Sequence, residues 1–168
     1  MSIEQKIVDS VSSLAQIMLD KQALLATAES CTGGMMAQVV TDLPGSSVWF
    51  DRGFVTYSNA AKQQLLDVNA VTLAQSGAVS QACVTEMVAG ALRFSDADYV
   101  VACSGIAGPG GGSPDKPVGT VWLAWGRRQG GKRARIITKV FHFEGNRQAV
   151  RQQTTLAGLK GLIGLVNN

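Results

Sequence analysis

The sequence has few of the residues that most often bind metals or form covalent cross-links. It contains one histidine and three cysteines among 168 residues, and the cysteines lack the paired spacing of metal ligands. A metal site built on several histidines is excluded, and neither zinc nor disulfide bonds are expected. We therefore expect no metal and no cofactor. The one histidine, His142, stands between two phenylalanines on a predicted strand, a position more typical of a structural or surface residue than of a catalytic base.

Charged residues and long apolar runs are also scarce. Asp, Glu, Lys and Arg make up 16% of the chain, aromatic residues 6%, and the net charge is +3. The basic residues around Arg133 have no aromatic residues interleaved, which favours a solvated hairpin over a nucleic-acid site. No apolar run approaches the roughly 20 residues that span a bilayer, and no signal peptide is visible. We expect a cytoplasmic protein with no nucleic-acid or membrane partner, and the sequence leaves open whether it forms a homo-oligomer.

Apolar residues and glycines are abundant instead. Hydrophobic residues make up 46% of the chain and 19 residues are glycine, a mixture typical of a compact α/β domain. Helical periodicity is expected in residues 3–19, 35–43, 59–66, 70–75, 81–92 and from about 146, and strands in residues 23–26, 48–57, 99–103, 120–125 and 135–143. This alternation predicts a single three-layer α/β/α domain over residues 1–168, with a mixed, mostly parallel sheet whose last pair is antiparallel.

The segment TAESCTGG, residues 27–34, lies between a strand-like apolar segment and one with helical spacing. Ser30 is thus predicted at a strand-to-helix turn, where Gly33 and Gly34 let a ligand approach the backbone. The first amide groups of the following helix would favour an anion or a developing oxyanion. Ser30 is then a nucleophile, an anion ligand or an ordinary helix N-cap, because serine is common at that position.

Because histidine is nearly absent, lysine is the next candidate for a base. Lys62 lies one helical turn beyond Asn59, just after a strand that ends at Tyr57. A partly desolvated lysine has a lowered pKa and can accept a hydroxyl proton, and Tyr57 can relay or orient that proton. The alternative is a solvated helix lysine beside a core tyrosine. Lys116 completes an S-x-x-K pattern, but in a flexible glycine loop.

The glycine-rich loop from Gly105 to Gly119 follows a predicted buried strand, where open α/β sheets bind ligands. It matches neither the P-loop nor the G-x-G-x-x-G pattern. It is either a loop that surrounds a phosphate or ribose or a mobile surface loop. Arg147 and Arg151, four residues apart near the start of the last helix, either bind a phosphate or form a solvated face.

Five segments together resemble the C-terminal domain of the CinA (competence/damage-inducible) family. They are TAESCTGG (27–34), GFVTYSN (53–59), GAVS (77–80), SGIAGP (104–109) and KPVGTV (116–121), in this order. The resemblance extends from about Ile7 to Leu165. It implies hydrolysis of the amide of nicotinamide mononucleotide to nicotinate mononucleotide and ammonia, in pyridine-nucleotide salvage, by a metal-independent serine mechanism. The partner it implies is therefore a small nucleotide substrate.

The resemblance also implies roles for individual residues. Ser30 would be the nucleophile, Lys62 its general base and Tyr57 an assisting hydroxyl. Binding groups would come from Cys31, Thr32, Gly33, Gly34, Asn59, Ser104, Gly105, Ile106, Ala107, Gly108 and Arg147, with the 31–34 backbone as oxyanion hole or anion cradle and the 104–112 loop and Arg147 near the ribose phosphate. Two alternatives stay open: a non-catalytic nucleotide-binding regulatory module, and an amidase acting on another nucleotide or small amide.

Overall fold

The computed structural model describes all residues from Met1 to Asn168. Five strands form one sheet in the order β2-β1-β3-β4-β5. They are β1 (Leu25–Glu29), β2 (Phe50–Val55), β3 (Tyr99–Gly105), β4 (Thr120–Gln129) and β5 (Lys132–His142). β1 pairs in parallel with β2 and β3, whereas β4 pairs antiparallel with β3 and β5. Four strands therefore run in one direction and β4 opposes them, which confirms the mixed, mostly parallel sheet.

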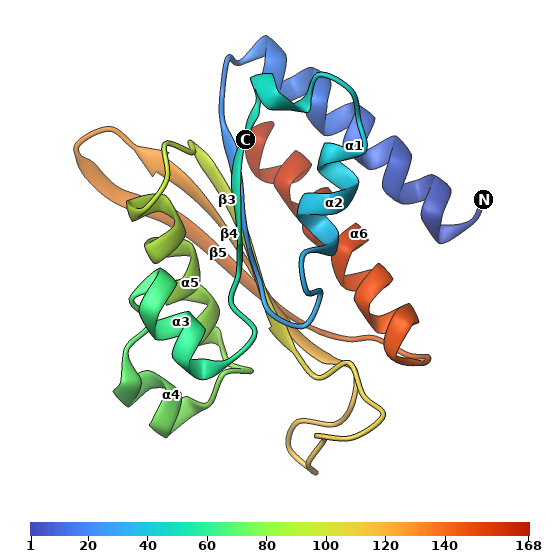
Figure 1. Ribbon diagram of the computed structural model, residues 1–168, viewed down its shortest axis with the longest axis vertical. Helices are drawn as coiled ribbons and strands as arrows, with labels where there is room; N and C mark the ends of the chain where they lie inside the picture. The colour runs from blue at the N-terminus through green and yellow to red at the C-terminus, as the bar shows by residue number, and fades with distance from the viewer.

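Helices cover both faces of the sheet (Figure 1). One layer contains α1 (Ile3–Asp20), α2 (Met35–Thr41) and α6 (Arg147–Val166), and the other contains α3 (Asn59–Leu66), α4 (Ala70–Ser76) and α5 (Gln81–Arg93). Successive residues of β3 point to opposite faces, so Val101 joins the apolar core beneath α1 and α6 while Val100 and Ala102 join the core beneath α5. The predicted three-layer α/β/α architecture is confirmed.

Most helices begin at a capping side chain that can be recognised in the sequence. Ser2, Ser58, Ser80 and Asn146 each accept a hydrogen bond from the backbone N–H three residues further on. Some expected bounds were wrong. A short 3₁₀ helix (η1, Ser46–Val48) precedes β2, which begins at residue 50 instead of the expected 48. α2 ends at Thr41 instead of the expected residue 43. β1 continues to Glu29. This extension was not predicted, because the later residues of β1 include polar side chains, which are buried but give no apolar pattern in the sequence.

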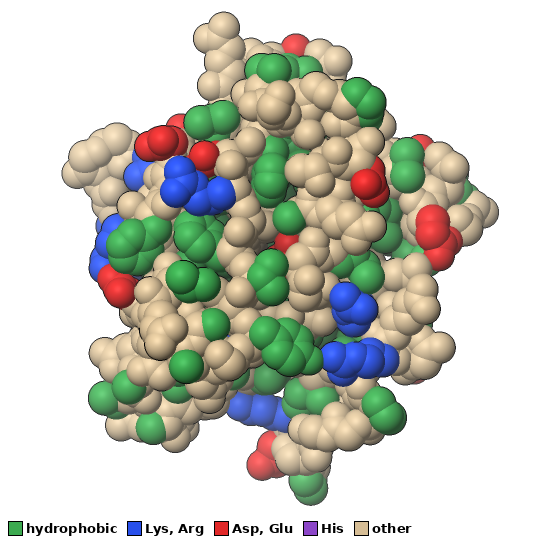
Figure 2. Space-filling view, in the orientation of Figure 1, with side chains coloured by type: hydrophobic (Ala, Val, Ile, Leu, Met, Phe, Trp, Pro, Cys, Tyr) green, Lys and Arg blue, Asp and Glu red, His purple; other side chains and the backbone are tan.

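The surface shows no patch of one charge sign on the face drawn in Figure 2. Lys and Arg side chains lie there in small groups, separated from one another by neutral atoms. The basic residues near Gly130 and Gly131 belong to the exposed hairpin between β4 and β5. No helix combines the length and the apolar character that crossing a membrane requires.

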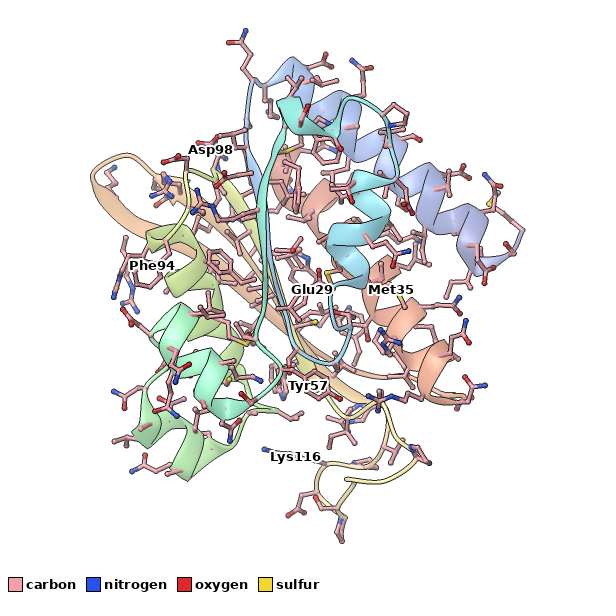
Figure 3. The ribbon with its side chains drawn as sticks, in the orientation of Figure 1. Glu29, Met35, Tyr57, Phe94, Asp98 and Lys116 are labelled. Atoms are coloured by element: carbon pink, nitrogen blue, oxygen red, sulfur yellow. The ribbon has the colours of Figure 1, made fainter.

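The adjacent parallel strands β2, β1 and β3 end at the same edge of the sheet, and the connections that follow β1 and β2 diverge there. The chain leaves β1 toward α2 on one face and leaves the neighbouring β2 toward α3 on the other face. Open α/β sheets bind ligands where the connections separate in this way. This edge brings together Ser30, the segment from Thr56 to Lys62, and the loop that begins at Ser104. Figure 3 shows Tyr57 there, between the two helix layers.

Candidate active site

Ser30 lies directly after β1, in a turn that leads into α2. Its backbone N–H donates to the carbonyl of Cys103 at 3.2 Å, which ties the turn to β3. Gly33 and Gly34 have φ angles of 60° and 100°, in the left-handed region that glycine adopts without strain. The N-cap of α2 is Gly34 and not Ser30. The interpretation of Ser30 as an ordinary helix cap was therefore wrong, and its side chain is free for another role.

The N-terminus of α2 is occupied by the buried carboxylate of Glu29. Its oxygens accept hydrogen bonds from the Met36 amide at 2.9 Å, the Ala37 amide at 2.8 Å and the Thr32 hydroxyl at 2.6 Å. The expectation that these helix amides face a ligand was wrong, because Glu29 already binds them (Figure 3). The amides of Cys31 and Thr32, beside Ser30, donate to no group of the protein. They are the remaining donors for an oxyanion in this turn.

Lys62 reaches the Ser30 hydroxyl from the other side of the sheet edge. Its side chain is only 1% exposed, and its Nζ lies 2.9 Å from Ser30 Oγ. Nζ also lies 2.8 Å from the carbonyl oxygen of Thr56 and 3.1 Å from that of Tyr57. The Ser58 cap of α3 fixes the helix turn that carries Lys62. The predicted pair of serine and lysine therefore comes together within hydrogen-bond distance.

The three oxygen neighbours of Lys62 Nζ match the three N–H groups of an ammonium, and the neutral amine that a base requires keeps two of these contacts. Carbonyl oxygens only accept hydrogen bonds, so the Thr56 and Tyr57 carbonyls take two N–H groups of Lys62. A neutral amine has no further N–H, and its lone pair is then left for the Ser30 hydroxyl. Burial lowers the pKa of Lys62, with the nearby cysteine side chains opposing this shift. The lowered pKa raises the fraction of the neutral amine, which is the form that a general base requires.

Cys31 is the other nucleophilic side chain in the turn, but it is held in its neutral form. A hydrogen bond with Cys103 and burial raise the pKa of the Cys31 thiol well above its usual value. A thiol reacts as the thiolate, so Cys31 is a poor nucleophile at neutral pH. Of the two neighbours, Ser30 is the one whose side chain contacts an amine, that of Lys62.

The Tyr57 hydroxyl does not contact this pair. Tyr57 is 60% exposed, and its hydroxyl accepts a hydrogen bond from Arg147 Nη2 at 2.8 Å. Arg147 Nη1 donates to the Gly108 carbonyl at 2.9 Å, so Arg147 connects the start of α6, the glycine-rich loop and Tyr57. The contact of Tyr57 with Lys62 is made by its backbone carbonyl, not by the hydroxyl that was expected to relay a proton.

A cavity of about 190 Å³ lies beside Ser30 and Lys62. Nine of the predicted site residues line it: Ser30, Cys31, Tyr57, Asn59, Lys62, Ser104, Gly105, Ala107 and Arg147. Thr32, Gly33, Gly34, Ile106 and Gly108 do not line it; the Thr32 side chain bonds to Glu29, and the two glycines shape the turn. Ala78 and Val79 complete the wall and were missed, because two apolar residues before a helix cap carry no chemical signal.

Other candidates from the sequence lie away from the cavity. Lys116 Nζ donates to the Ser76 carbonyl at 2.9 Å and joins the glycine-rich loop to the end of α4. His142 is exposed at the end of β5. Arg151 donates to the Thr32 carbonyl at 2.8 Å and supports the turn from outside the cavity. His, Cys, Asp and Glu side chains form no group of three or more that could hold a metal ion.

Comparison with known proteins places the chain among similar sequences and structures. The family model described as the CinA C-terminal domain matches residues 8–166. Nicotinamide-nucleotide amidohydrolase PncC of Escherichia coli is 53% identical over 149 residues, which are 89% of this chain and 88% of that protein. The Pseudomonas putida protein of the same name is 54% identical over 143 residues, 85% of this chain and 86% of that protein.

A solved structure has the same fold. The competence/damage inducible protein CihA from Agrobacterium tumefaciens superimposes with a TM-score of 0.89 at 39% sequence identity, covering 97% of this chain and 96% of that chain.

Proposed function

Because the chain belongs to the CinA C-terminal domain family, we propose that it is a nicotinamide-nucleotide amidohydrolase. In this proposal it hydrolyses the amide of nicotinamide mononucleotide, giving nicotinate mononucleotide and ammonia for pyridine-nucleotide salvage. The two curated relatives with that name, each more than half identical to this chain, support the substrate class. The serine-lysine mechanism is supported by the resemblance in the segments around Ser30 and Lys62 and by the geometry of these two residues in this chain.

One observation carries the mechanism: Lys62 Nζ lies 2.9 Å from Ser30 Oγ at the wall of a cavity. Burying a lysine is unfavourable unless its polar group is satisfied, and here two carbonyls fix the amine against a serine hydroxyl. A binding module does not require this arrangement, whereas a nucleophile does.

The reaction proceeds in two steps through an ester on Ser30. Lys62 Nζ takes the hydroxyl proton as Ser30 Oγ forms a bond to the amide carbon of the substrate. The free Cys31 amide, from a residue of the cavity wall, stabilises the oxyanion, and protonated Lys62 passes its proton to the departing nitrogen, which leaves as ammonia. Lys62 then takes a proton from a water molecule that attacks the ester, and returns this proton to Ser30 Oγ as the bond between Oγ and the acyl carbon breaks and the carboxylate product is released. The mechanism uses no metal ion, so EDTA is expected to leave activity unchanged.

The size and lining of the cavity suggest how the substrate is held. Its volume of about 190 Å³ is below the roughly 300 Å³ or more typical of pockets that enclose a whole small ligand. The cavity therefore takes the pyridine ring and its amide against Ala78 and Val79, with Asn59 and Ser104 as polar neighbours. The ribose phosphate lies at the mouth, where Arg147 can pair with the phosphate by exchanging its contacts to Tyr57 and Gly108.

The test is release of ammonia from nicotinamide mononucleotide, with and without EDTA, by the wild-type chain and by Ser30→Ala. We expect Ser30→Ala to lose at least about 1,000-fold in kcat. Ser13→Ala is the matched control, because Ser13 is exposed on α1 and bonds only to its own helix. Full activity in Ser30→Ala would remove Ser30 as the nucleophile. Binding of the nucleotide by wild type without ammonia release would instead favour the non-catalytic module.

A further inference from the structure

A second, larger cavity lies on the α6 side of the sheet, beneath its outermost strand. This groove, of about 440 Å³, runs between β5 and the second half of α6. Ile137 of β5 is paired with Trp125 of β4, and Phe141 with Val121, so these side chains share the face toward α6. Trp125, Ile137 and Phe141 form an apolar floor. No residue of the site described above lines this groove.

The charged side chains around the groove all have the same sign. Arg135 and Lys139 come from the same face of β5, and Lys160 comes from α6; no Asp or Glu lines the groove. None of the three basic side chains forms an ion pair or donates a hydrogen bond to the protein. Lys139 Nζ lies 5.0 Å from the centroid of the Phe141 ring. A cleft with apolar walls and unpaired cations concentrates positive potential, which attracts an anion.

Gly164 lines the groove, and no contact within the chain requires a glycine at this position. At Gly158 an added Cβ would lie 2.9 Å from Met36, and at Gly161 it would lie 2.1 Å from the Trp125 ring, so both glycines are required by packing. At Gly164 an added Cβ would meet nothing within 4 Å. Glycine inside a helix costs about 1 kcal/mol relative to alanine. Packing within the chain does not explain this glycine, but space for a ligand in the groove does.

We propose that the groove binds a small anion that carries an aromatic ring, about the size of a nucleoside monophosphate. The ring lies on the apolar floor of Trp125, Ile137 and Phe141, and the anionic group pairs with Arg135 and Lys160 at the rim. The volume falls within the range of roughly 300–1,000 Å³ that small-molecule pockets occupy.

Charge argues against a second copy of this chain as the occupant. In a two-fold contact both copies present the same patch, so the basic rim formed by Arg135, Lys139 and Lys160 would meet the same basic rim of the partner copy. Like charges facing one another oppose association. An anion satisfies the cations and an aromatic ring covers the exposed Ile137, so one ligand accounts for both features.

The test is a titration of the full chain with AMP, followed by two-dimensional ¹H–¹⁵N NMR and calorimetry, with adenosine and inorganic phosphate as separate arms. The chain has three tryptophans, so the Trp125 indole signal can be assigned by its loss in Trp125→Phe. We expect AMP to shift the Trp125 indole and the amides of residues 157–165. We expect AMP to bind at least about tenfold more tightly than adenosine or phosphate, because a charge-assisted hydrogen bond and ring burial act together.

Variants localise the binding. Arg135→Gln combined with Lys160→Gln is expected to weaken AMP by about tenfold or more, and Gly164→Leu to block it by filling the groove. Lys132→Gln combined with Arg133→Gln is the control, since it removes the same charge on the hairpin outside the groove. Four results overturn the proposal: no AMP binding, shifts confined to the Ser30 cavity, equal binding of phosphate or adenosine, or groove signals that move with protein concentration alone.

Discussion

The cavity beside Ser30 and the groove beneath β5 hold their charged side chains in opposite ways. In the cavity, Lys62 is 1% exposed and its amine has three oxygen neighbours within 3.1 Å. In the groove, Arg135, Lys139 and Lys160 are exposed, and none has a polar partner in the protein. The cavity holds one amine in a fixed position before any ligand binds, whereas the basic side chains of the groove can still change conformation to contact a ligand.

This difference indicates two kinds of site. A buried, fully oriented group can stabilise a transition state without reorganising during the reaction, and its pKa responds strongly to its surroundings. Exposed cations without a partner contribute little to folding, so they remain available to bind a ligand. Changes in the cavity should therefore alter chemistry, and changes in the groove should not.

The largest effect is expected from Lys62→Met, which replaces the carbon stem of lysine with an unbranched apolar side chain of similar length and removes the amine. We expect kcat for ammonia release to fall at least about 1,000-fold, because Ser30 then has no group to take its proton. Lys116→Met is the matched control, since Lys116 bonds only to the Ser76 carbonyl in the glycine-rich loop. An unchanged kcat in Lys62→Met would remove Lys62 as the base.

A smaller effect is expected from Glu29→Gln, which disturbs the turn without touching Ser30. The glutamine NH₂ would face the Met36 or Ala37 amide, leaving a buried donor unpaired at a cost of about 1–3 kcal/mol. We expect kcat to fall about 10- to 100-fold with little change in KM, because the Cys31 amide shifts relative to Ser30. Glu86→Gln is the control: Glu86 also binds a helix start, at Asn69 and Thr72, outside the cavity. Equal loss of kcat in both variants would contradict the positioning role of Glu29.

Arg147→Ala is expected to affect binding more than chemistry. Loss of one charge-assisted contact to the phosphate should raise KM about tenfold and leave kcat within about threefold. Arg93→Ala removes the same charge from an exposed ion pair with Asp67 and should change neither parameter. A fall in kcat with constant KM would assign Arg147 a role in the chemical step instead.

The smallest effect is expected from Lys160→Gln, which tests whether the two sites are independent. Lys160 lines the groove, and we expect ammonia release by this variant to stay within about twofold of wild type, because surface charges at a distance are screened by salt. The check is a full kinetic curve at physiological ionic strength. A tenfold loss would show that the two sites are not separate.

The sequence predicted what depends on local spacing. The strand-to-helix turn at Ser30 and the position of Lys62 one turn into a capped helix both follow from short patterns, and the structure joins the two side chains. The mixed, mostly parallel sheet and its antiparallel last pair were also predicted.

What the sequence could not predict depends on contacts between distant segments. Arg147 lies 39 residues from Gly108 and 90 from Tyr57, and Arg151 lies 119 from Thr32, so no local pattern indicates which arginine faces the cavity. Glu29 stands next to Ser30 in the sequence, yet its side chain reaches the start of α2. That contact changes which amides are free, and it depends on packing between β1 and α2.

The lowered pKa of Lys62 has consequences with a definite sign. Burial favours the neutral amine in the folded chain, whereas the unfolded chain has the ordinary value of 10.5. Between the lowered value and 10.5 the unfolded chain binds more protons, so the stability contributed by this group rises with pH in that window. It is lowest at pH values below the folded pKa, where burying the ammonium opposes folding. Lys62→Met should remove this part of the pH dependence.

The most direct test of the account is the titration of Lys62 itself. In the chain labelled with ¹³C at lysine Cε, the signal absent from Lys62→Met belongs to Lys62 and can be followed with pH by NMR. We predict a midpoint below 10.5, and kcat/KM for ammonia release that rises with pH through the same midpoint. A midpoint at or above 10.5, or an activity profile that ignores it, would contradict Lys62 as a neutral base for Ser30.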